Sequence, residues 1–177
     1  AKKYNLKIIE DCALSLGSTI NNKHTGLFGD AGIFSFYPVK HITTGEGGMI
    51  IMNSKSLYSK LKLNRAFGVD RTHDKRSKSG MYDVLTLGYN YRMSEIHAAI
   101  GLQQMKKIQG FVKCRVDNFK LYSDLMNKIN GVKYLDCNNK KMFSSNYCFT
   151  IILNDKYRSK RDKIKKLLSN FGIGTSV

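Results

Sequence analysis

Three short apolar stretches in the first third of the chain have the pattern of buried β-strands. They cover residues 6–10, 31–36 and 49–52, and apolar runs of this length are typical of strands buried in a parallel sheet. The first run leads directly into Asp11. Parallel strands deliver such side chains to the carboxyl edge of a sheet, where open α/β folds bind their ligands. The pattern therefore predicts an α/β fold in which three strands converge on one neighbourhood.

Apolar residues at helical spacing predict helices over much of the remaining chain. These helices are expected at residues 54–67, 94–108, 111–129 and 157–171. Ser54 or Asn53 is placed to cap the first of them, since either side chain can accept a hydrogen bond from a free backbone N–H group. Residues 147–153 predict a further strand. The polar residues 69–88 predict a long surface loop.

The order of these elements predicts two parts. Residues 1–114 are expected to form part of a large ligand-binding domain, and residues 115–177 a connector helix and the start of a smaller α+β domain. The chain opens close to a strand and closes at residues 171–177, within what we expect to be another strand. We therefore expect a central fragment of a longer protein, truncated at both termini.

Composition places the chain among globular proteins and excludes several other classes. It has 177 residues, of which 42% are hydrophobic and 24% charged, enough to bury a core. No apolar run approaches the ~20 residues that span a bilayer, and a cytoplasmic location is the default expectation. The four cysteines and four histidines show neither C-x-x-C nor H-E-x-x-H spacing, so we expect reduced thiols and no metal site.

The formal net charge of +17 is concentrated towards the C-terminus. Its densest stretch, residues 156–168, has Ile164, Leu167 and Leu168 at helical spacing, with lysines on the other face. A solvated amphipathic helix explains this pattern most simply. A nucleic-acid-binding face is the alternative, but no base-reading motif accompanies the charge. A positive field would also favour substrates that carry phosphate groups.

Lys40 is the strongest candidate for a reactive group. It follows the strand that contains Ser35 and precedes the glycine-rich residues 45–48. Partial desolvation of a lysine favours its neutral, nucleophilic amine, for which a cofactor carbonyl is the natural target. Individually, Asp11 could instead cap the following turn and Asn90 could be a turn residue. The glycines could equally be the punctuation of a hairpin.

Four segments considered together resemble a known family. Residues 10–13, 29–36, 38–49 and 88–93 are similar, in order and spacing, to the DegT/DnrJ/EryC1/StrS family of pyridoxal-phosphate-dependent sugar aminotransferases. The resemblance implies transferase fold type I, with a large α/β domain whose sheet is mainly parallel and a smaller C-terminal domain. It also implies a homodimer with shared active sites. Members of the family are about twice as long as this chain.

The resemblance implies a role for each of four residues. Lys40 matches the catalytic lysine, which holds pyridoxal 5'-phosphate as a Schiff base and then transfers protons. Asp11 matches the carboxylate that pairs with the pyridine nitrogen and so keeps the ring an electron sink. Ser35 matches a serine that binds the cofactor phosphate, and Asn90 a residue that reaches the phosphate in the neighbouring subunit. Leu14 stands where the family usually has glutamine or histidine.

The implied reaction moves an amino group from L-glutamate to a nucleotide-linked keto-sugar through Lys40. A sugar dehydratase of the same family is one alternative. That branch carries histidine at the lysine position, and here His41 follows Lys40. A non-catalytic basic protein that keeps the fold and binds nucleic acid or has a regulatory role is the other alternative. Steeply salt-dependent DNA binding without cofactor binding would distinguish it.

Overall fold

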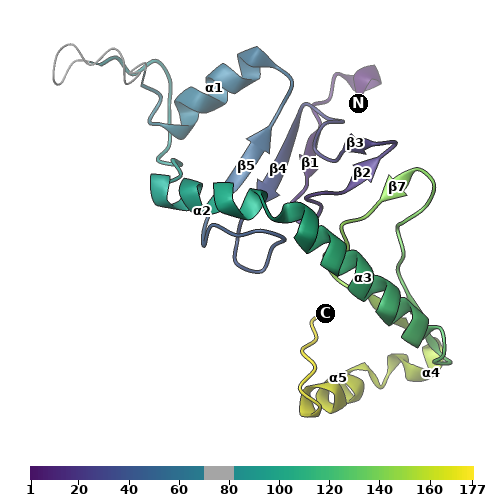
Figure 1. Cartoon of the computed structure of the whole chain (residues 1–177). Helices are drawn as coiled ribbons and strands as arrows, with labels where there is room; N and C mark the ends of the chain where they lie inside the picture. The colour runs from purple at the N-terminus through teal and green to yellow at the C-terminus, as the bar shows by residue number, and fades with distance from the viewer. Residues whose placement is uncertain (70–81) are drawn as a thin grey trace.

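A three-stranded sheet forms the centre of the molecule (Figure 1). The computed structural model describes residues 1–69 and 82–177. Strands β1 (Ile9–Asp11), β4 (Ala31–Ser35) and β5 (Gly48–Ile51) lie in the order β1-β4-β5, and β1 runs parallel to β4. β5 is antiparallel to β4. A strand therefore forms in each of the three expected stretches, although β1 begins only at Ile9. The expected burial holds mainly for β4, since most residues of β1 and β5 are exposed. The parallel arrangement holds for β1 and β4 and not for β5, since a turn connects β4 to β5 without a crossover helix.

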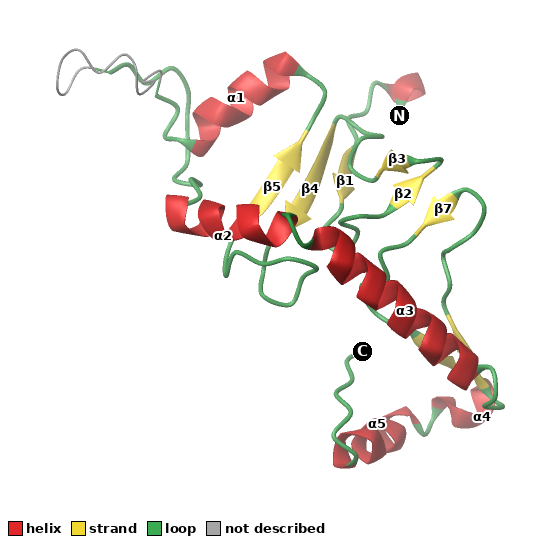
Figure 2. Ribbon diagram, in the orientation of Figure 1, coloured by secondary structure: helices red, strands yellow, loops and turns green. Residues whose placement is uncertain are grey.

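One face of this sheet is covered and carries the core. Cys12, Phe34, Phe36 and Ile42 are buried together. Helices α2 (Glu95–Met105) and α3 (Ile108–Met126) pass along this side of the sheet (Figure 2), and Ile108 and Phe111 at the start of α3 pack against the cluster. Alternate residues of a strand point to opposite faces, so Phe34 lies in the core whereas the adjacent Ile33 does not.

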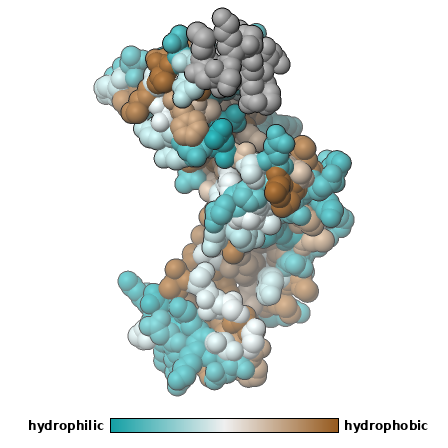
Figure 3. Space-filling view, turned by 90° about the vertical axis from the view of Figure 1, so that its left-hand side faces the viewer, coloured by the Kyte–Doolittle hydropathy of each residue, from teal (hydrophilic) through white to brown (hydrophobic). Residues whose placement is uncertain are grey.

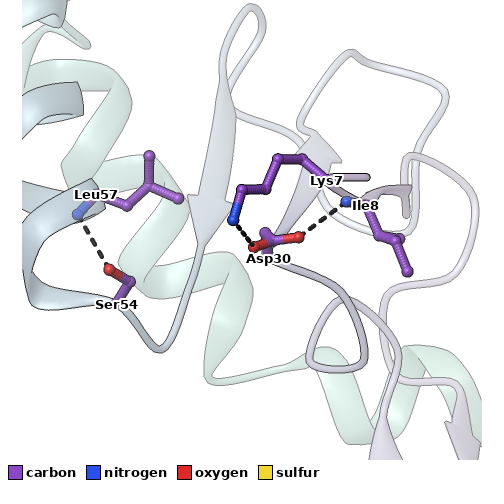
Figure 4. A network of polar contacts seen from close by, with 5 residues as sticks. All are labelled: Lys7, Ile8, Asp30, Ser54 and Leu57. Atoms are coloured by element: carbon purple, nitrogen blue, oxygen red, sulfur yellow. Dashed lines mark hydrogen bonds and ion pairs between the residues drawn. The ribbon is translucent and has the colours of Figure 1, made fainter. Parts of the chain in front are cut away.

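Helix α1 (Lys55–Arg65) follows β5. Ser54 caps it, because its side chain accepts a hydrogen bond from the Leu57 amide at 3.2 Å (Figure 4). Of the two capping residues that the sequence allowed, the structure uses Ser54. Capping satisfies one of the backbone N–H groups that have no partner within a first helical turn.

A groove of about 590 Å³ lies between α1 and the second face of the sheet. Its apolar lining comes from both elements: Ile9, Ala31, Ile33, Ile50, Leu57 and Leu61. At its rim the Asp30 carboxylate accepts a hydrogen bond from the Ile8 amide at 2.9 Å and pairs with Lys7 at 3.4 Å (Figure 4). These contacts hold the segment before β1 against the start of β4.

A small antiparallel sheet was not expected from the sequence. It consists of β2 (Thr19–Ile20), β3 (Lys23–His24) and β7 (Met142–Phe143), in the order β3-β2-β7. It joins residues 142–143 to the segment that follows β1. The expected division at residue 114 falls inside α3, and this division stays a prediction.

The remaining elements follow α3. Strands β6 (Val132–Tyr134) and β8 (Ile151–Leu153) pair antiparallel, and aromatic contacts join Phe149 to Phe119 of α3 and to Tyr134 of β6. The chain then forms α4 (Asp155–Arg158) and α5 (Arg161–Asn170). The single helix expected at 157–171 is therefore wrong in its start, because α4 ends at Arg158 and α5 begins a new helix.

A short 3₁₀ turn and a hydrophilic helical region lie near the two ends of the chain. A single 3₁₀ turn, η1 (Lys2–Tyr4), precedes β1. At the other end, hydrophilic side chains gather in the region of α5, at the bottom of Figure 3. Lys163 and Lys166 are exposed and Ile164 and Leu168 half-buried, as the amphipathic pattern predicts. Leu167, expected on the apolar face, is instead 49% exposed, and Lys165 is half-buried. None of the described helices is both long and apolar enough to cross a lipid bilayer.

The expected surface loop at 69–88 lies mostly outside the described residues. At its edges, Val69 and Val84 form an isolated antiparallel bridge. The four cysteines are free thiols, as expected, with Cys12 buried and the others exposed.

Candidate active site

Asp11 and Ser35 lie on the same side of the central sheet and at the same edge. Asp11 is the last residue of β1 and pairs with Ile33 of β4. Ser35 is the last residue of β4, two positions beyond Ile33, and residues two apart on a strand share a face. Because β1 and β4 are parallel, their carboxyl ends meet at this edge. The convergence expected from the sequence is confirmed for these two residues.

Asp11 uses part of its carboxylate within the chain. Its Oδ1 accepts a hydrogen bond from the Ala13 amide at 3.1 Å, which is the capping role that the sequence left open. The side chain is exposed, and within the described residues Oδ2 has no hydrogen-bond partner. One carboxylate oxygen therefore remains available to a ligand. Leu14, three residues further on, is 47% exposed.

Ser35 begins the turn that carries Lys40. Its Oγ accepts a hydrogen bond from the Tyr37 amide at 3.3 Å, which leaves the hydroxyl proton free to be donated. The turn is closed where the Phe36 amide donates to the Gly47 carbonyl at 2.9 Å. Gly45 has φ of +81°, a conformation that glycine adopts without steric cost. The glycines therefore shape the turn, as the hairpin interpretation predicted.

The Lys40 side chain is half-buried. Its backbone amide donates to the Tyr37 carbonyl at 3.0 Å, which fixes the position of its Cα. Its Nζ lies 5.4 Å from the centroid of the Tyr147 ring. In the part of the chain that is described, no hydrogen bond or ion pair holds this amine.

His41, directly after Lys40, is turned into the protein. It is 5% exposed, and its Nε2 lies 2.9 Å from Ser145 Oγ. Burial lowers the pKa of His41 from 6.5 to about 4; the nearby Arg115 and Lys40 charges act in the same direction, and a hydrogen bond with Ser145 opposes them. The ring is therefore neutral at pH 7. Its Nδ1 is buried and has no partner among the described residues.

Ser145 links His41 to the segment after β1. It is fully buried, and its amide donates to Ser18 Oγ at 2.9 Å while the two hydroxyl oxygens lie 2.9 Å apart. No sequence pattern could reveal this connection, because Ser18 and Ser145 are separated by 127 positions. Neither serine was predicted to have a role, and His41 was considered only for the dehydratase alternative.

The Glu10 side chain lies on the opposite face of the central sheet from Asp11 and binds the loop before β4. Its carboxylate accepts hydrogen bonds from the amides of Gly26, Phe28 and Gly29 at 2.7, 2.6 and 2.6 Å. Burial raises the pKa of this carboxyl, but the three backbone hydrogen bonds and the charge of Lys23 outweigh burial and place the pKa below its ordinary value. The role of Glu10 was not predicted either, since a glutamate within a strand gives no sign of which amides its carboxylate will bind.

Asn90 lies apart from these residues. It forms an isolated antiparallel bridge with Ala66 and is exposed, and its Oδ1 accepts a hydrogen bond from Arg92 Nε at 3.4 Å. No contact between described residues joins it to Asp11, Ser35 or Lys40. The four predicted site residues therefore do not form one cluster within a single chain.

The groups of Asp11, Ser35 and the turn that follows Ser35 fit, by their chemistry, a pyridine aldehyde that carries a phosphate. Asp11 offers a carboxylate oxygen to a ring nitrogen, Ser35 a hydroxyl donor to a phosphate, and Lys40 an amine to a carbonyl. The Asp11 oxygen and the Lys40 amine have no competing partner among the described residues, so the donor set matches the implied cofactor.

Comparison with known proteins identifies the family. The model of the DegT/DnrJ/EryC1/StrS aminotransferase family matches residues 1–177. The chain belongs to this family, and the resemblance seen in its motifs is confirmed.

Curated relatives share this assignment. The chain is 36% identical over 177 residues to UDP-4-amino-4,6-dideoxy-N-acetyl-beta-L-altrosamine transaminase of Campylobacter jejuni, a match that covers 100% of the chain and 46% of the relative. It is 40% identical over 129 residues to GDP-perosamine synthase of Escherichia coli O157:H7, covering 73% of the chain and 34% of the relative. The chain thus spans less than half the length of these relatives.

Solved structures confirm the predicted fold class. Helicobacter pylori PseC, an aminotransferase involved in the biosynthesis of pseudoaminic acid, superposes with a TM-score of 0.88 and 31% identity over 97% of this chain and 44% of its own. The PLP form of the putative sugar aminotransferase Spr1654 from Streptococcus pneumoniae gives a TM-score of 0.84 with 25% identity, over 97% and 43%. The described residues are thus part of the type I fold of these transferases.

Proposed function

We propose that the full-length protein is a pyridoxal-phosphate-dependent aminotransferase that moves an amino group from L-glutamate to a nucleotide-linked keto-sugar. The observation that carries the proposal is the Lys40 amine, which has no hydrogen bond or ion pair among the described residues and stands on the turn that leaves the sheet edge of Asp11 and Ser35. The names of the UDP-sugar and GDP-sugar relatives support the substrate class. We place the enzyme in the cytoplasm.

Three residues would hold the cofactor. The free oxygen of Asp11 would face the pyridine nitrogen and keep it protonated by its negative charge. The Ser35 hydroxyl would donate to the phosphate, and the Lys40 amine would bind the aldehyde carbon covalently. Bound pyridoxal phosphate supplies an electron sink that makes the α-proton of an amino acid acidic.

Lys40 would then serve as the proton carrier. Once released from the cofactor, its neutral amine would accept the α-proton of the donor, and the resulting ammonium group would return a proton to the carbon on the other side of the amino nitrogen. The backbone at Lys40 is fixed by its bond to Tyr37 while Nζ has no such bond. The chain thus fixes the backbone of the residue and gives its amine no hydrogen bond or ion pair among the described residues.

Asn90 supports the proposal that the enzyme is a homodimer. It is exposed and separate from Lys40 in its own chain. A second copy could therefore receive the Asn90 side chain at its cofactor phosphate, which would complete each site with a residue from the other subunit.

The surroundings of His41 favour transamination over dehydration. A dehydratase would need the histidine at the position that faces the cofactor. His41 is instead buried, with Nε2 against Ser145, while Lys40 is the residue whose amine remains without a polar partner among the described residues. The nucleic-acid alternative rests on basic charge alone, and a solvated helix also explains the densest stretch of that charge, residues 156–168.

The decisive experiment measures covalent capture of the cofactor. The full-length protein is incubated with pyridoxal phosphate and reduced with borohydride, and the labelled peptide is mapped. We expect label at Lys40, loss of label in Lys40→Ala, and full label in Lys55→Ala, a control at an exposed lysine of α1. A folded protein that carries no label at Lys40 would refute the proposal.

Donor and acceptor are tested next in the same protein. With L-glutamate alone, we expect 2-oxoglutarate in an amount equal to the bound cofactor. With glutamate and a nucleotide-linked keto-sugar, 2-oxoglutarate should form over many turnovers. If no 2-oxoglutarate forms either with glutamate alone or with glutamate and the keto-sugar, glutamate is not the donor. This conclusion would hold even when Lys40 is labelled.

A further inference from the structure

Tyr147 contacts Lys40 from a distant part of the chain. The Lys40 Nζ lies 5.4 Å from the centroid of the Tyr147 ring. The His41 ring lies 5.4 Å from the same centroid, and the Arg115 guanidinium 5.7 Å from it. One aromatic ring thus contacts the candidate catalytic lysine, its neighbour and an arginine of α3.

The backbone of Tyr147 is held independently of Lys40. Its carbonyl accepts a hydrogen bond from Arg115 Nη1 at 2.9 Å. Two residues earlier, buried Ser145 bonds to Ser18 and to His41. Because these contacts are made by other residues, the backbone that carries the ring is held whether or not the Lys40 amine lies against the ring.

The Tyr147 ring offers the Lys40 amine a favourable contact. An ammonium group within about 6 Å of an aromatic centroid is attracted by the negative face of the ring. Since no hydrogen bond or ion pair among these residues competes, the ring selects one position of a long and otherwise flexible side chain. Such a side chain loses considerable rotamer freedom when it is confined.

We propose that Tyr147 is a positioning residue for Lys40: its ring holds the amine that stands on the turn after Ser35, and the Ser18–Ser145–His41 contacts hold the segment that carries the ring. The proposal deepens the proposed function and rests on it for the meaning of the site. Confining the amine before it meets the cofactor lowers the entropy lost on capture. The ring also gives the amine a defined resting place when it is released.

The first test needs no cofactor. The folded full-length protein is treated with a trace of acetic anhydride, and the acetylation rate of Lys40 is measured by peptide mapping relative to Lys55. We expect this relative rate to rise about two- to fivefold in Tyr147→Leu, because the ring no longer covers and attracts the amine. Tyr147→Phe keeps the aromatic face and should match the wild type.

The second test uses pyridoxal phosphate as the probe. The concentration that gives half-maximal borohydride-fixed label at Lys40 should rise about two- to fivefold in Tyr147→Leu and stay unchanged in Tyr147→Phe. Equal values in all three proteins would overturn the proposal. So would a Phe variant that behaves like Leu, since that would assign the effect to the hydroxyl group.

The two tests separate this proposal from the proposed function. If acetylation responds to Tyr147→Leu but pyridoxal phosphate labels no lysine, the ring contact stands and the aminotransferase assignment fails. If labelling occurs at Lys40 and neither measurement responds to the ring, the assignment stands and the positioning role fails. Far-ultraviolet circular dichroism checks the fold of each variant, and Tyr147→Met, also without a ring, is measured by the same criteria if Tyr147→Leu does not fold.

Discussion

His41 Nε2 and Ser145 Oγ lie 2.9 Å apart although the two residues are 104 positions apart in the chain. The contact ties the turn that carries Lys40 to the segment that carries Tyr147. His41 is therefore a structural residue at the border of the candidate site, and the geometry of Lys40 depends on a residue far along the chain.

Substitution of His41 should change how stability depends on pH. Below pH 6.5 the unfolded chain binds a proton at this ring, whereas the pKa of folded His41 is about 4. The free energy of unfolding should therefore fall between pH 6.5 and about 4, by on the order of 2–3 kcal/mol. His41→Gln should remove this part of the decline in urea unfolding curves.

The matched control for this experiment is His97→Gln in α2, which should retain the decline. A decline that is identical in wild type and His41→Gln would show that the buried ring does not titrate as its surroundings indicate.

Replacement of Glu10 should loosen the loop before β4. Glu10→Ala leaves the amides of Gly26, Phe28 and Gly29 without their acceptor and should lower the free energy of unfolding by about 2–4 kcal/mol. The effect depends on pH. Because the pKa of folded Glu10 is below the ordinary 4.5, its contribution is fully present above pH 4.5 and is lost as the pH falls through the lower, folded value.

Glu46→Ala is the control, since its exposed side chain lies on the glycine-rich turn. It should be nearly neutral in the same thermal and urea measurements. Equal loss in both variants would argue against the three-amide contact as the source of stability.

Asp11→Asn should separate the effect of the negative charge on turnover from the effect of the side chain's shape on stability. The asparagine Oδ1 can still accept the hydrogen bond from Ala13, so the melting temperature should stay close to that of the wild type. The negative charge is lost, and turnover of glutamate should fall by about 100-fold or more. Asp124→Asn on the exposed side of α3 should leave turnover unchanged. Wild-type turnover in Asp11→Asn would remove Asp11 from the proposed site.

Gly32→Ala should destabilise the central sheet. A Cβ at this position of β4 would collide with the backbone of Gly26, and overpacking of this kind costs about 1–3 kcal/mol. A Cβ added at Gly110 of α3 would meet no neighbouring atom within 4 Å, so Gly110→Ala should instead stabilise by about 0.5–1 kcal/mol. Thermal unfolding should show a lower melting temperature for Gly32→Ala and a higher one for Gly110→Ala. An unchanged melting temperature in Gly32→Ala would contradict the close approach of Gly32 to Gly26.

Local sequence patterns predicted the elements that short-range forces determine. The cap at Ser54, helices α1 and α2, and strands β4 and β5 follow from spacing within a few residues. The placement of Asp11 and Ser35 at one edge follows from the same patterns, because the end of a parallel strand has a fixed place in a sheet.

Long-range contacts could not be predicted in this way. Strands β2, β3 and β7 each have two residues, which is too short for any periodicity. The pairing of β2 with β7 depends on residues more than 100 positions apart. The same is true of Ser145 and Tyr147, whose roles arise only where distant segments meet. Asn90 illustrates a third limit, since its proposed partner lies in another copy of the chain.

The contact between His41 and Ser145 also sets an order of events during synthesis. A ribosome adds about 5–20 residues per second, so the 104 positions between the two residues correspond to roughly 5–20 s of elongation. Throughout that interval the nascent Lys40 turn lacks both the serine that anchors it and the ring that contacts its amine. The candidate site can therefore assemble only after residues 145–147 have been translated. Until then, the turn that carries Lys40 lacks its contacts with Ser145 and Tyr147.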